Sequence, residues 1–413
     1  MVDINAFTLD NGLRVFVYPN KSLHTFAINL SVDYGIFNEN KGQSGLAHLI
    51  EHMVFEGTKN IRGRELKKSL DNYTTYWNGE TTGEITSYDL KSVSFNKINR
   101  LIEIIKGMVS DSEFPYKNLV NEKNAAINEV VAKFGVEFGL ENVIPKAYLF
   151  KREPSDFLGG NPNKIIDLEK EILLQEYKKN YIPNNFVLSV VGKVDTNNIK
   201  KEIKRNFDGI EKGEKTGFRN VNLEAVPYRE VSIKNPNPYH TQSNIIVGIK
   251  LPGSEKLYSD YENARASIGV VRALLTNNFM KNLRDMRGIT YTAGADLELG
   301  RYSGYMALFS TVKNKDVEIA KKIMSSELEK IINGDIQEST VKNARKASKI
   351  SFFELQDNTL SFAYAISASI LKYGRTPNEL YKEGENITID DLRATEKYFK
   401  DYQRKNSLTL ISS

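Results

Sequence analysis

The stretch that decides this sequence is Gly45-Leu46-Ala47-His48-Leu49-Ile50-Glu51-His52-Met53-Val54-Phe55. As a helix, it places His48 and His52 one turn apart on one face, with Glu51 beside them. The other positions are almost all apolar, and a helix that is apolar on every side is buried. A buried carboxylate is costly unless a partner or a nearby cation compensates its charge. The pattern therefore predicts a divalent metal held by the two imidazoles; two core histidines and a paired glutamate are the alternative.

The composition limits the classes of protein and of metal ligand. The chain has 413 residues, which suits two or three domains of roughly 150 residues each. Its 40% hydrophobic and 26% charged residues are typical of a globular protein. The net charge is only +5 and the two signs are interleaved, so no nucleic-acid partner is expected. The absence of cysteine excludes disulfides and thiolate ligands, which leaves histidine and carboxylate side chains as metal donors.

The sequence shows no sign of secretion or membrane insertion. The amino terminus, Met1–Asn5, lacks the basic segment and apolar run of a secretory signal. No run of roughly 18 apolar residues occurs, so no membrane-spanning helix is expected. These features predict a cytoplasmic protein with no membrane partner.

The two halves of the sequence end in the same unit, a helix followed by a strand. The segment Tyr177–Asn185 has the spacing Tyr-x3-Tyr-x3-Asn before an apolar strand, and the segment Tyr398–Asn406 repeats it. Alternating runs around the Asn11-Gly12 turn indicate an antiparallel hairpin. The sequence thus predicts an α+β fold of two duplicated domains, each an antiparallel-rich sheet packed with helices. The predicted bounds are 1–210 for the N-terminal metal-binding domain, 211–227 for a polar linker and 228–413 for the second domain.

A second predicted helix, Leu119–Phe134, carries two further carboxylates. Glu122 and Glu129 lie two turns apart on a face that borders the apolar stripe of this helix. Periodicity alone favours a solvated helix edge for this pair. The second domain has no histidine after His240, so it must contribute something other than metal ligands.

The motif Gly-x-Ala-His-x-x-Glu-His-Met-x-Phe-x-Gly-Thr, which occupies Gly45–Thr58, resembles that of the pitrilysin (M16) family of zinc metallopeptidases. The chain looks like the short, two-domain subfamily, which includes the mitochondrial processing peptidase subunits and bacterial homologues. At the distance from the second histidine where the family has its third metal ligand, this sequence has Glu129. The resemblance therefore implies that Glu129 is a zinc ligand and that Glu122 orients a ligating imidazole.

Two further motifs carry the resemblance. The segment Asn78–Tyr88 is similar to the edge strand with which the family binds substrate, although Gly79 stands where the family has alanine and Thr74 where it has glycine. This similarity implies a substrate-binding role for four consecutive residues, Asn78, Gly79, Glu80 and Thr81. The family's Arg-x6-Tyr pair matches Arg284 and Tyr291, for which it implies a role in catalysis.

The resemblance implies a zinc-dependent endopeptidase that cleaves extended or unfolded peptides. One zinc per chain would be held by His48, His52 and Glu129, with Glu51 as general base on a zinc-bound water. Arg284 and Tyr291 would donate hydrogen bonds to the oxyanion or to neighbouring carbonyls.

In the family, two such chains form a clamshell in which the Arg/Tyr pair faces the zinc site of the other half. Because this chain has both motifs, it is expected to form a homodimer with sites completed in trans, or a heterodimer as in some relatives. Two rival interpretations remain: a catalytically silent peptide-binding or scaffold subunit, and a metal-dependent hydrolase that acts on non-peptide esters or amides.

Overall fold

The structure is a computed structural model that describes residues 3–135, 139–215, 217, 221–234 and 241–412. The chain divides into two compact units, and each unit contains one segment from the other half of the sequence. The first unit consists of Met1–Phe134, Ser155–Asn220 and Phe353–Pro377; the second consists of Gly135–Pro154, Val221–Phe352 and Asn378–Ser413. The predicted domain bounds, 1–210 and 228–413, did not include this exchange, in which residues 135–154 belong to the second unit and 353–377 to the first.

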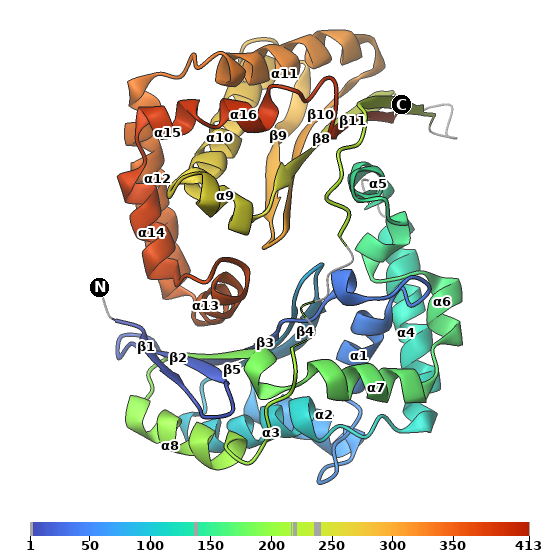
Figure 1. The fold of residues 1–413 in the computed structure, drawn as a ribbon, viewed down its shortest axis with the longest axis vertical. Coiled ribbons are helices and arrows are strands. Elements are labelled where there is room, and N and C mark those ends of the chain that lie inside the picture. Colours follow the sequence, from blue (N-terminus) through green and yellow to red (C-terminus); the bar gives the residue numbers. More distant parts are fainter. Residues whose placement is uncertain (1–2, 136–138, 216, 218–220, 235–240, 413) are drawn as a thin grey trace. The chain divides into compact units, whose positions relative to one another are not determined.

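The first unit is built on a six-stranded sheet with the order β1-β2-β6-β3-β5-β4 (Figure 1). The strands are β1 Asn5–Thr8, β2 Arg14–Pro19, β3 Phe26–Val32, β4 Tyr76–Thr81, β5 Thr86–Ser92 and β6 Phe186–Gly192. Neighbouring strands are antiparallel except β2 and β6, which are parallel. The antiparallel pairing of β1 with β2 confirms the predicted hairpin around Asn11-Gly12. Strand β4 lies at one edge, and its outer side has no partner strand among the described residues.

Helices cover this sheet on both faces. They are α1 Leu46–Met53, α2 Gly63–Tyr73, α3 Ile98–Ser110, α4 Tyr116–Gly135, α6 Pro162–Asp167, α7 Lys170–Asn180, α8 Thr196–Phe207 and α13 Thr359–Tyr373. Helix α1 packs against β4 and β5, and α3 packs against α8. Helix α13, from the second half of the sequence, packs on β3, β5 and β6 on the side opposite α3 and α8 (Figure 1).

The contact between α13 and the sheet is polar at its centre. Ser189 on β6 donates a hydrogen bond to the carbonyl of Ala363 (2.7 Å), and Ser367 donates to the hydroxyl of Ser189 (3.1 Å). Small hydroxyl side chains let the helix backbone approach the strands closely and satisfy polar groups that are buried there. These bonds fix α13 to the sheet of the first unit.

On the same face, the carboxyl group of Asp89 on β5 accepts a hydrogen bond from the side chain of Asn29 on β3 (2.9 Å). Burial raises the pKa of Asp89 to about 6, with a smaller contribution from the charge of Glu80, although the bond from Asn29 acts in the opposite direction. At neutral pH the Asp89 side chain is therefore ionised although its buried environment favours the neutral acid.

Asp89→Asn is expected to stabilise the first unit at neutral pH and to have little effect in acid. The folded pKa exceeds the ordinary value of 3.8, so this group's contribution to the free energy of unfolding is present below that value and is lost as the pH rises through 6. A shift of this size corresponds to at most about 3 kcal/mol, and asparagine retains an oxygen that can accept from Asn29. Thermal unfolding at about pH 4 and pH 8 measures the difference, with Asp10→Asn, at an exposed position, as control. Equal changes at both pH values would contradict the assignment.

The second unit has a five-stranded sheet with the order β7-β11-β8-β10-β9. The strands are β7 Arg229–Ile233, β8 Gln242–Pro252, β9 Thr290–Leu299, β10 Ser303–Lys313 and β11 Ser407–Ser412. Its helices are α5 Gly139–Phe150, α9 Ser254–Asp260, α10 Ala264–Phe279, α11 Val317–Ile332, α12 Glu338–Asp357, α14 Pro377–Asn386, α15 Ile389–Arg393 and α16 Glu396–Phe399. Helix α5 packs on β8 and β11, α10 packs on β9, and α11 packs on β10.

A buried lysine joins α5 to the sheet of the second unit. The ammonium group of Lys250 on β8 donates to the carbonyl of Leu149 (3.3 Å) at the end of α5 and to the carbonyl of Glu224 (2.9 Å). The carbonyls at a helix C-terminus have no partner within the helix, and a cation satisfies them well. Lys250 thus holds α5 in the second unit, although α5 belongs to the first half of the sequence.

The two sheets share one topology. In the first unit, β2 is parallel to β6, and β6 is antiparallel to β3. In the second unit, β7 is parallel to β11, and β11 is antiparallel to β8. Two more strands complete the matching orders, which are β2-β6-β3-β5-β4 in the first unit and β7-β11-β8-β10-β9 in the second. This correspondence confirms the predicted α+β fold of two duplicated domains.

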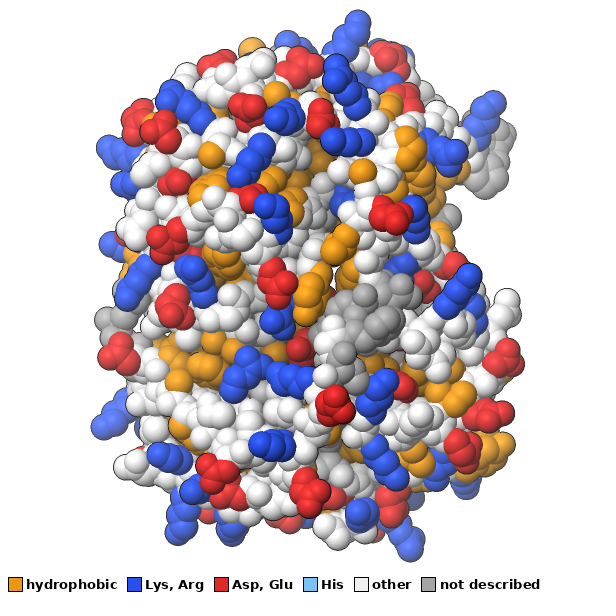
Figure 2. All heavy atoms as spheres, in the orientation of Figure 1, with side chains coloured by type: hydrophobic (Ala, Val, Ile, Leu, Met, Phe, Trp, Pro, Cys, Tyr) orange, Lys and Arg blue, Asp and Glu red, His pale blue; other side chains and the backbone are white. Residues whose placement is uncertain are grey.

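The surface is consistent with the interleaved charges of the sequence. Figure 2 shows basic and acidic side chains interspersed over the face that it draws, without a broad field of one sign. Among the described residues, no helix combines the length and the apolar character that a bilayer crossing requires.

Candidate metal centre

The side chain of Glu39 caps the N-terminus of α1, the helix that carries the two histidines. Gly45 precedes the helix with φ +95°, and the side chain of Glu39 accepts hydrogen bonds from the amides of Gly45 (3.2 Å) and Ala47 (2.9 Å). These amides have no partner within the helix, and an anion is favourable at this end of the helix dipole. Four buried apolar residues anchor the helix: Leu46, Leu49, Ile50 and Met53. The histidines are thus presented from a rigid element.

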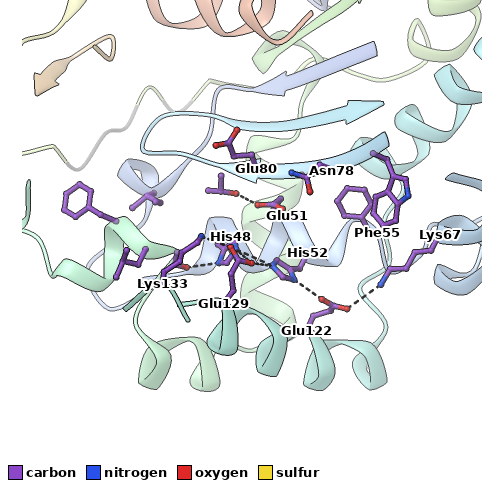
Figure 3. A pocket seen from close by; sticks show the side chains of 17 residues that line it. His48, Glu51, His52, Phe55, Lys67, Asn78, Glu80, Glu122, Glu129 and Lys133 are labelled. Atoms are coloured by element: carbon purple, nitrogen blue, oxygen red, sulfur yellow. Dashed lines mark hydrogen bonds and ion pairs between the residues drawn. The ribbon is translucent and has the colours of Figure 1, made fainter. Parts of the chain in front are cut away.

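Three potential ligand atoms converge beside α1 (Figure 3). The Nε2 atoms of His48 and His52 are 3.3 Å apart. Oε2 of Glu129, from α4, lies 3.5 Å from His48 Nε2 and 3.7 Å from His52 Nε2. The three atoms lie within 4.8 Å of one another, and the described residues contain no other such group. The structure therefore brings together the three residues for which the sequence suggested metal binding.

The hydrogen bonds of the other ring nitrogens determine the tautomers of both histidines. Nδ1 of His48 lies 3.0 Å from the carbonyl oxygen of Gly159, and Nδ1 of His52 lies 2.9 Å from Oε2 of Glu122. Both partners only accept, so each Nδ1 carries a proton, and in the neutral imidazole each Nε2 presents a lone pair. Two lone pairs 3.3 Å apart repel each other unless a cation or a proton lies between them.

The charges around the imidazoles favour a cation at this point. Burial lowers the pKa of His52, but its bonds to Glu122 and Glu129 outweigh burial and raise the pKa to about 9. In turn, the imidazoles of His48 and His52 hold the pKa of Glu129 below its usual range. Two imidazole nitrogens and one carboxylate oxygen are a donor set that zinc accepts in catalytic sites. These residues therefore fit a zinc ion.

Glu51 lies on the other side of the imidazoles, against the edge strand. It is 8% exposed, and its Oε2 accepts a hydrogen bond from the hydroxyl of Thr81 on β4 (2.8 Å). Burial raises the pKa of Glu51, while the neighbouring histidines act in the opposite direction. Gly79 leaves room for this carboxylate, since a Cβ there would lie 2.5 Å from Oε1. The side chain is thus confined in a position suited to proton transfer beside the ligand atoms.

A cavity of about 460 Å³ opens over these groups. Its lining includes Phe55 and Trp77, whose ring centroids are 5.1 Å apart. Ile36, Phe157 and Leu158 also line it. Most of the lining residues are charged or polar, and these apolar side chains form only part of the wall.

The four predicted substrate-binding residues all line this cavity, but they do not face the same way. Along β4 the burial alternates: Asn78 and Glu80 are exposed, whereas Gly79 and Thr81 are half-buried against Glu51. Alternation is a property of strand geometry, because successive side chains point to opposite faces. Thr81 contacts the buried carboxylate, which the edge-strand motif did not indicate.

Sequence profiles of known families match both halves of the chain. A profile described as "Insulinase (Peptidase family M16)" matches residues 14–148, which include the cluster of His48, His52 and Glu129. A profile described as "Peptidase M16 inactive domain" matches residues 167–348, which contain none of these three residues. The chain belongs to peptidase family M16.

Several relatives and a solved structure are similar to this chain over most of its length. An "Uncharacterized zinc protease" of Rickettsia bellii is 24% identical over 95% of this chain and 94% of its own length. The mitochondrial-processing peptidase subunit beta of Saccharomyces cerevisiae is 24% identical over 93% of this chain and 86% of its own. The crystal structure of a protease from Helicobacter pylori shares the fold with a TM-score of 0.86, 17% identity and full coverage of both chains. The relatives' names support a peptidase.

The Arg/Tyr pair of the M16 resemblance lies in the second unit, where two backbone irregularities present it. Arg284 belongs to a π-helical turn, Met280–Asp285, that follows α10. Tyr291 is skipped in the register between β9 and β10, which pairs Thr290 with Val312 and Thr292 with Thr311. Such bulges re-aim a side chain and are frequent near functional sites. The ring of Tyr291 is 82% exposed, and the guanidinium carbon of Arg284 lies 5.2 Å from its centre.

The sequence analysis did not single out Gly159, whose carbonyl fixes the ring of His48. Gly159 and Gly160 have φ values of +117° and +127°, a region that favours glycine. A Cβ on Gly159 would lie 2.8 Å from Nδ1 of His48. The adjacent glycines were a signal of special backbone geometry, but nothing in the sequence connected them with a histidine so far away in the chain.

Proposed function

We propose that this chain is a zinc-dependent endopeptidase that cleaves extended or unfolded peptides. The observation that carries the proposal is the convergence of His48, His52 and Glu129 beside the buried carboxylate of Glu51. The names of the M16 relatives, several of them zinc proteases, support it. A catalytically silent peptide-binding subunit has no use for a confined carboxylate next to the ligand atoms.

In the proposed mechanism, the imidazoles of His48 and His52 and the carboxylate of Glu129 would hold a zinc ion. Zinc, when bound, would lower the pKa of a bound water and polarise the peptide carbonyl. Glu51 accepts the proton of the attacking water as the carbon–oxygen bond forms, and passes it to the leaving amine as the carbon–nitrogen bond breaks. Its hydrogen bond from Thr81 keeps the carboxylate directed at the cavity rather than free to rotate. The raised pKa of Glu51, which burial causes, makes it a stronger base than an exposed glutamate.

The edge strand β4 supplies the binding surface in this proposal. Its outer backbone groups have no partner strand in the described part of the chain, so an extended peptide can add to the sheet there. Such binding uses the peptide backbone, which is available in unfolded chains and short peptides but not in folded domains. The proposal therefore predicts that substrates are selected mainly by the extended conformation of the peptide.

Purified protein is expected to contain about one zinc per chain and to cleave a mixed library of unstructured peptides. Dialysis against a strong chelator should abolish cleavage, and added zinc should restore it, because the ligand atoms belong to an open site. Metal analysis and mass spectrometry of the library measure both effects. Zinc-free protein that cleaves peptides equally well, or zinc-loaded protein that cleaves none, would contradict the proposal.

We further propose that Arg284 and Tyr291 act on the site of a second copy in a homodimer. The support is that relatives of this length are named as subunits or halves of larger peptidases, such as the first half of the protease PqqL from Escherichia coli. An exposed Tyr–Arg pair on an irregular edge suits a group that donates hydrogen bonds to a bound substrate.

Mixing two inactive variants tests this arrangement. Glu51→Gln and Tyr291→Phe should each lose most activity, and their mixture under subunit-exchange conditions should regain about a quarter of the wild-type rate. The fraction follows because half of the dimers are mixed and each mixed dimer has one intact site. No recovery, with exchange verified by differently tagged chains, would contradict sites shared between copies.

A further inference from the structure

Beyond the ligand atoms, a short chain of charges leads from His52 to helix α2. Glu122 uses Oε2 to hold His52, and its other oxygen, Oε1, lies 3.6 Å from the ammonium of Lys67 (Figure 3). The same ammonium forms an ion pair with Oε1 of Glu56, which lies just after α1. Asn118 on α4 donates to the other oxygen of Glu56 (2.5 Å). One lysine thus stands between two carboxylates.

Lys67 supplies the positive charge between these two carboxylates. Glu56 is buried and Glu122 is largely so. Burial and the neighbouring Glu122 raise the pKa of Glu56, and Lys67 acts in the opposite direction, so the lysine favours the charged form of both carboxylates. If Lys67 were neutral, repulsion between the two carboxylates would push Glu122 away from Glu56 and disturb the bond that orients the ring of His52. Groups that orient a metal-bound histidine typically change metal affinity by roughly 10–100-fold when they are removed.

We propose that Lys67 is a positioning residue for metal binding, which holds Glu122 against His52 by compensating the charge of Glu56. The inference rests on the metal site of the proposed function, but it does not depend on what the site cleaves. The fully buried apolar side chains of α2 are Leu66 and Leu70, whereas the side chain of Lys67 is 39% exposed. The apolar anchoring of the helix is therefore retained when Lys67 is replaced.

The test is the zinc affinity of the metal-free full chain, measured by competition with a chromophoric chelator. Lys67→Met should weaken zinc binding by roughly 10-fold or more, because Glu56 and Glu122 then repel each other. Glu56→Gln combined with Lys67→Met should restore the affinity to within about threefold of wild type, because the competing anion is gone. Lys68→Met, at the exposed neighbouring position, should change nothing and serves as the matched control.

The restoration in the double variant is what a merely structural role for Lys67 would not produce. Unchanged affinity in Lys67→Met, or a double variant as weak as the single one, would overturn the inference while the proposed peptidase stands. Failure of the wild type itself to bind zinc would overturn both. Should Lys67→Met not fold, Glu56→Gln alone remains decisive: it should bind zinc as tightly as wild type or more tightly, and a loss overturns the inference.

Discussion

Glu51→Gln is expected to lower kcat for peptide cleavage by about 10³-fold or more while zinc binding is retained, since a positioned general base typically contributes 10²–10⁴-fold. Glutamine has nearly the same volume, and its amide oxygen can still accept the hydrogen bond from Thr81. What it cannot do is take a proton from the attacking water. The substitution therefore removes one chemical step and leaves the cavity in place.

The measurement combines steady-state cleavage of a library-derived peptide with metal analysis of the same sample. Glu65→Gln, at an exposed position of α2, is the matched control and should keep wild-type kcat. A Glu51→Gln variant that cleaves as fast as the control would exclude Glu51 as the base. A wild type without cleavage that binds peptides as tightly as Glu51→Gln would favour the silent-subunit interpretation.

The sequence predicted the metal helix because the relevant geometry is local. Spacing along one helix fixes the relation of His48, Glu51 and His52, and the apolar residues around them predict burial correctly. Glu129 is different, since its side chain is 42% exposed and its partners lie on another helix. Its periodic position could indicate only a helix edge, and the resemblance to the M16 family was needed to connect it with the histidines.

Other features depend on long-range packing that no local pattern encodes. An amphipathic helix has a face to bury, but the pattern does not say which sheet will cover it. This is why a division near residue 210 could not show that α5 packs on β8 and β11, or that α13 packs on β3 and β6. The bulge at Tyr291 and the contact between Lys67 and Glu56 likewise arise from register and packing between separate elements.

Glu129→Gln is expected to weaken zinc binding by more than the roughly 10–100-fold that is typical of residues that only orient a ligand. The carboxylate is the one anionic donor among the three converging atoms, so glutamine removes a full negative charge from the proposed ligand set. Lys133, which pairs with Oε1 of Glu129 (2.6 Å), would also lose the compensating negative charge and leave an excess positive charge near the ligand atoms.

Both effects oppose metal binding, and cleavage should be lost along with the metal. Chelator competition on metal-free protein measures the affinity, with Glu122→Gln as the comparison, because Glu122 contacts an imidazole and is not one of the three converging residues. The proposed ligand set requires the loss at Glu129 to exceed the loss at Glu122. A Glu129→Gln variant that binds zinc as tightly as wild type would mean that the metal is held without this carboxylate, and the three-residue centre would have to be abandoned.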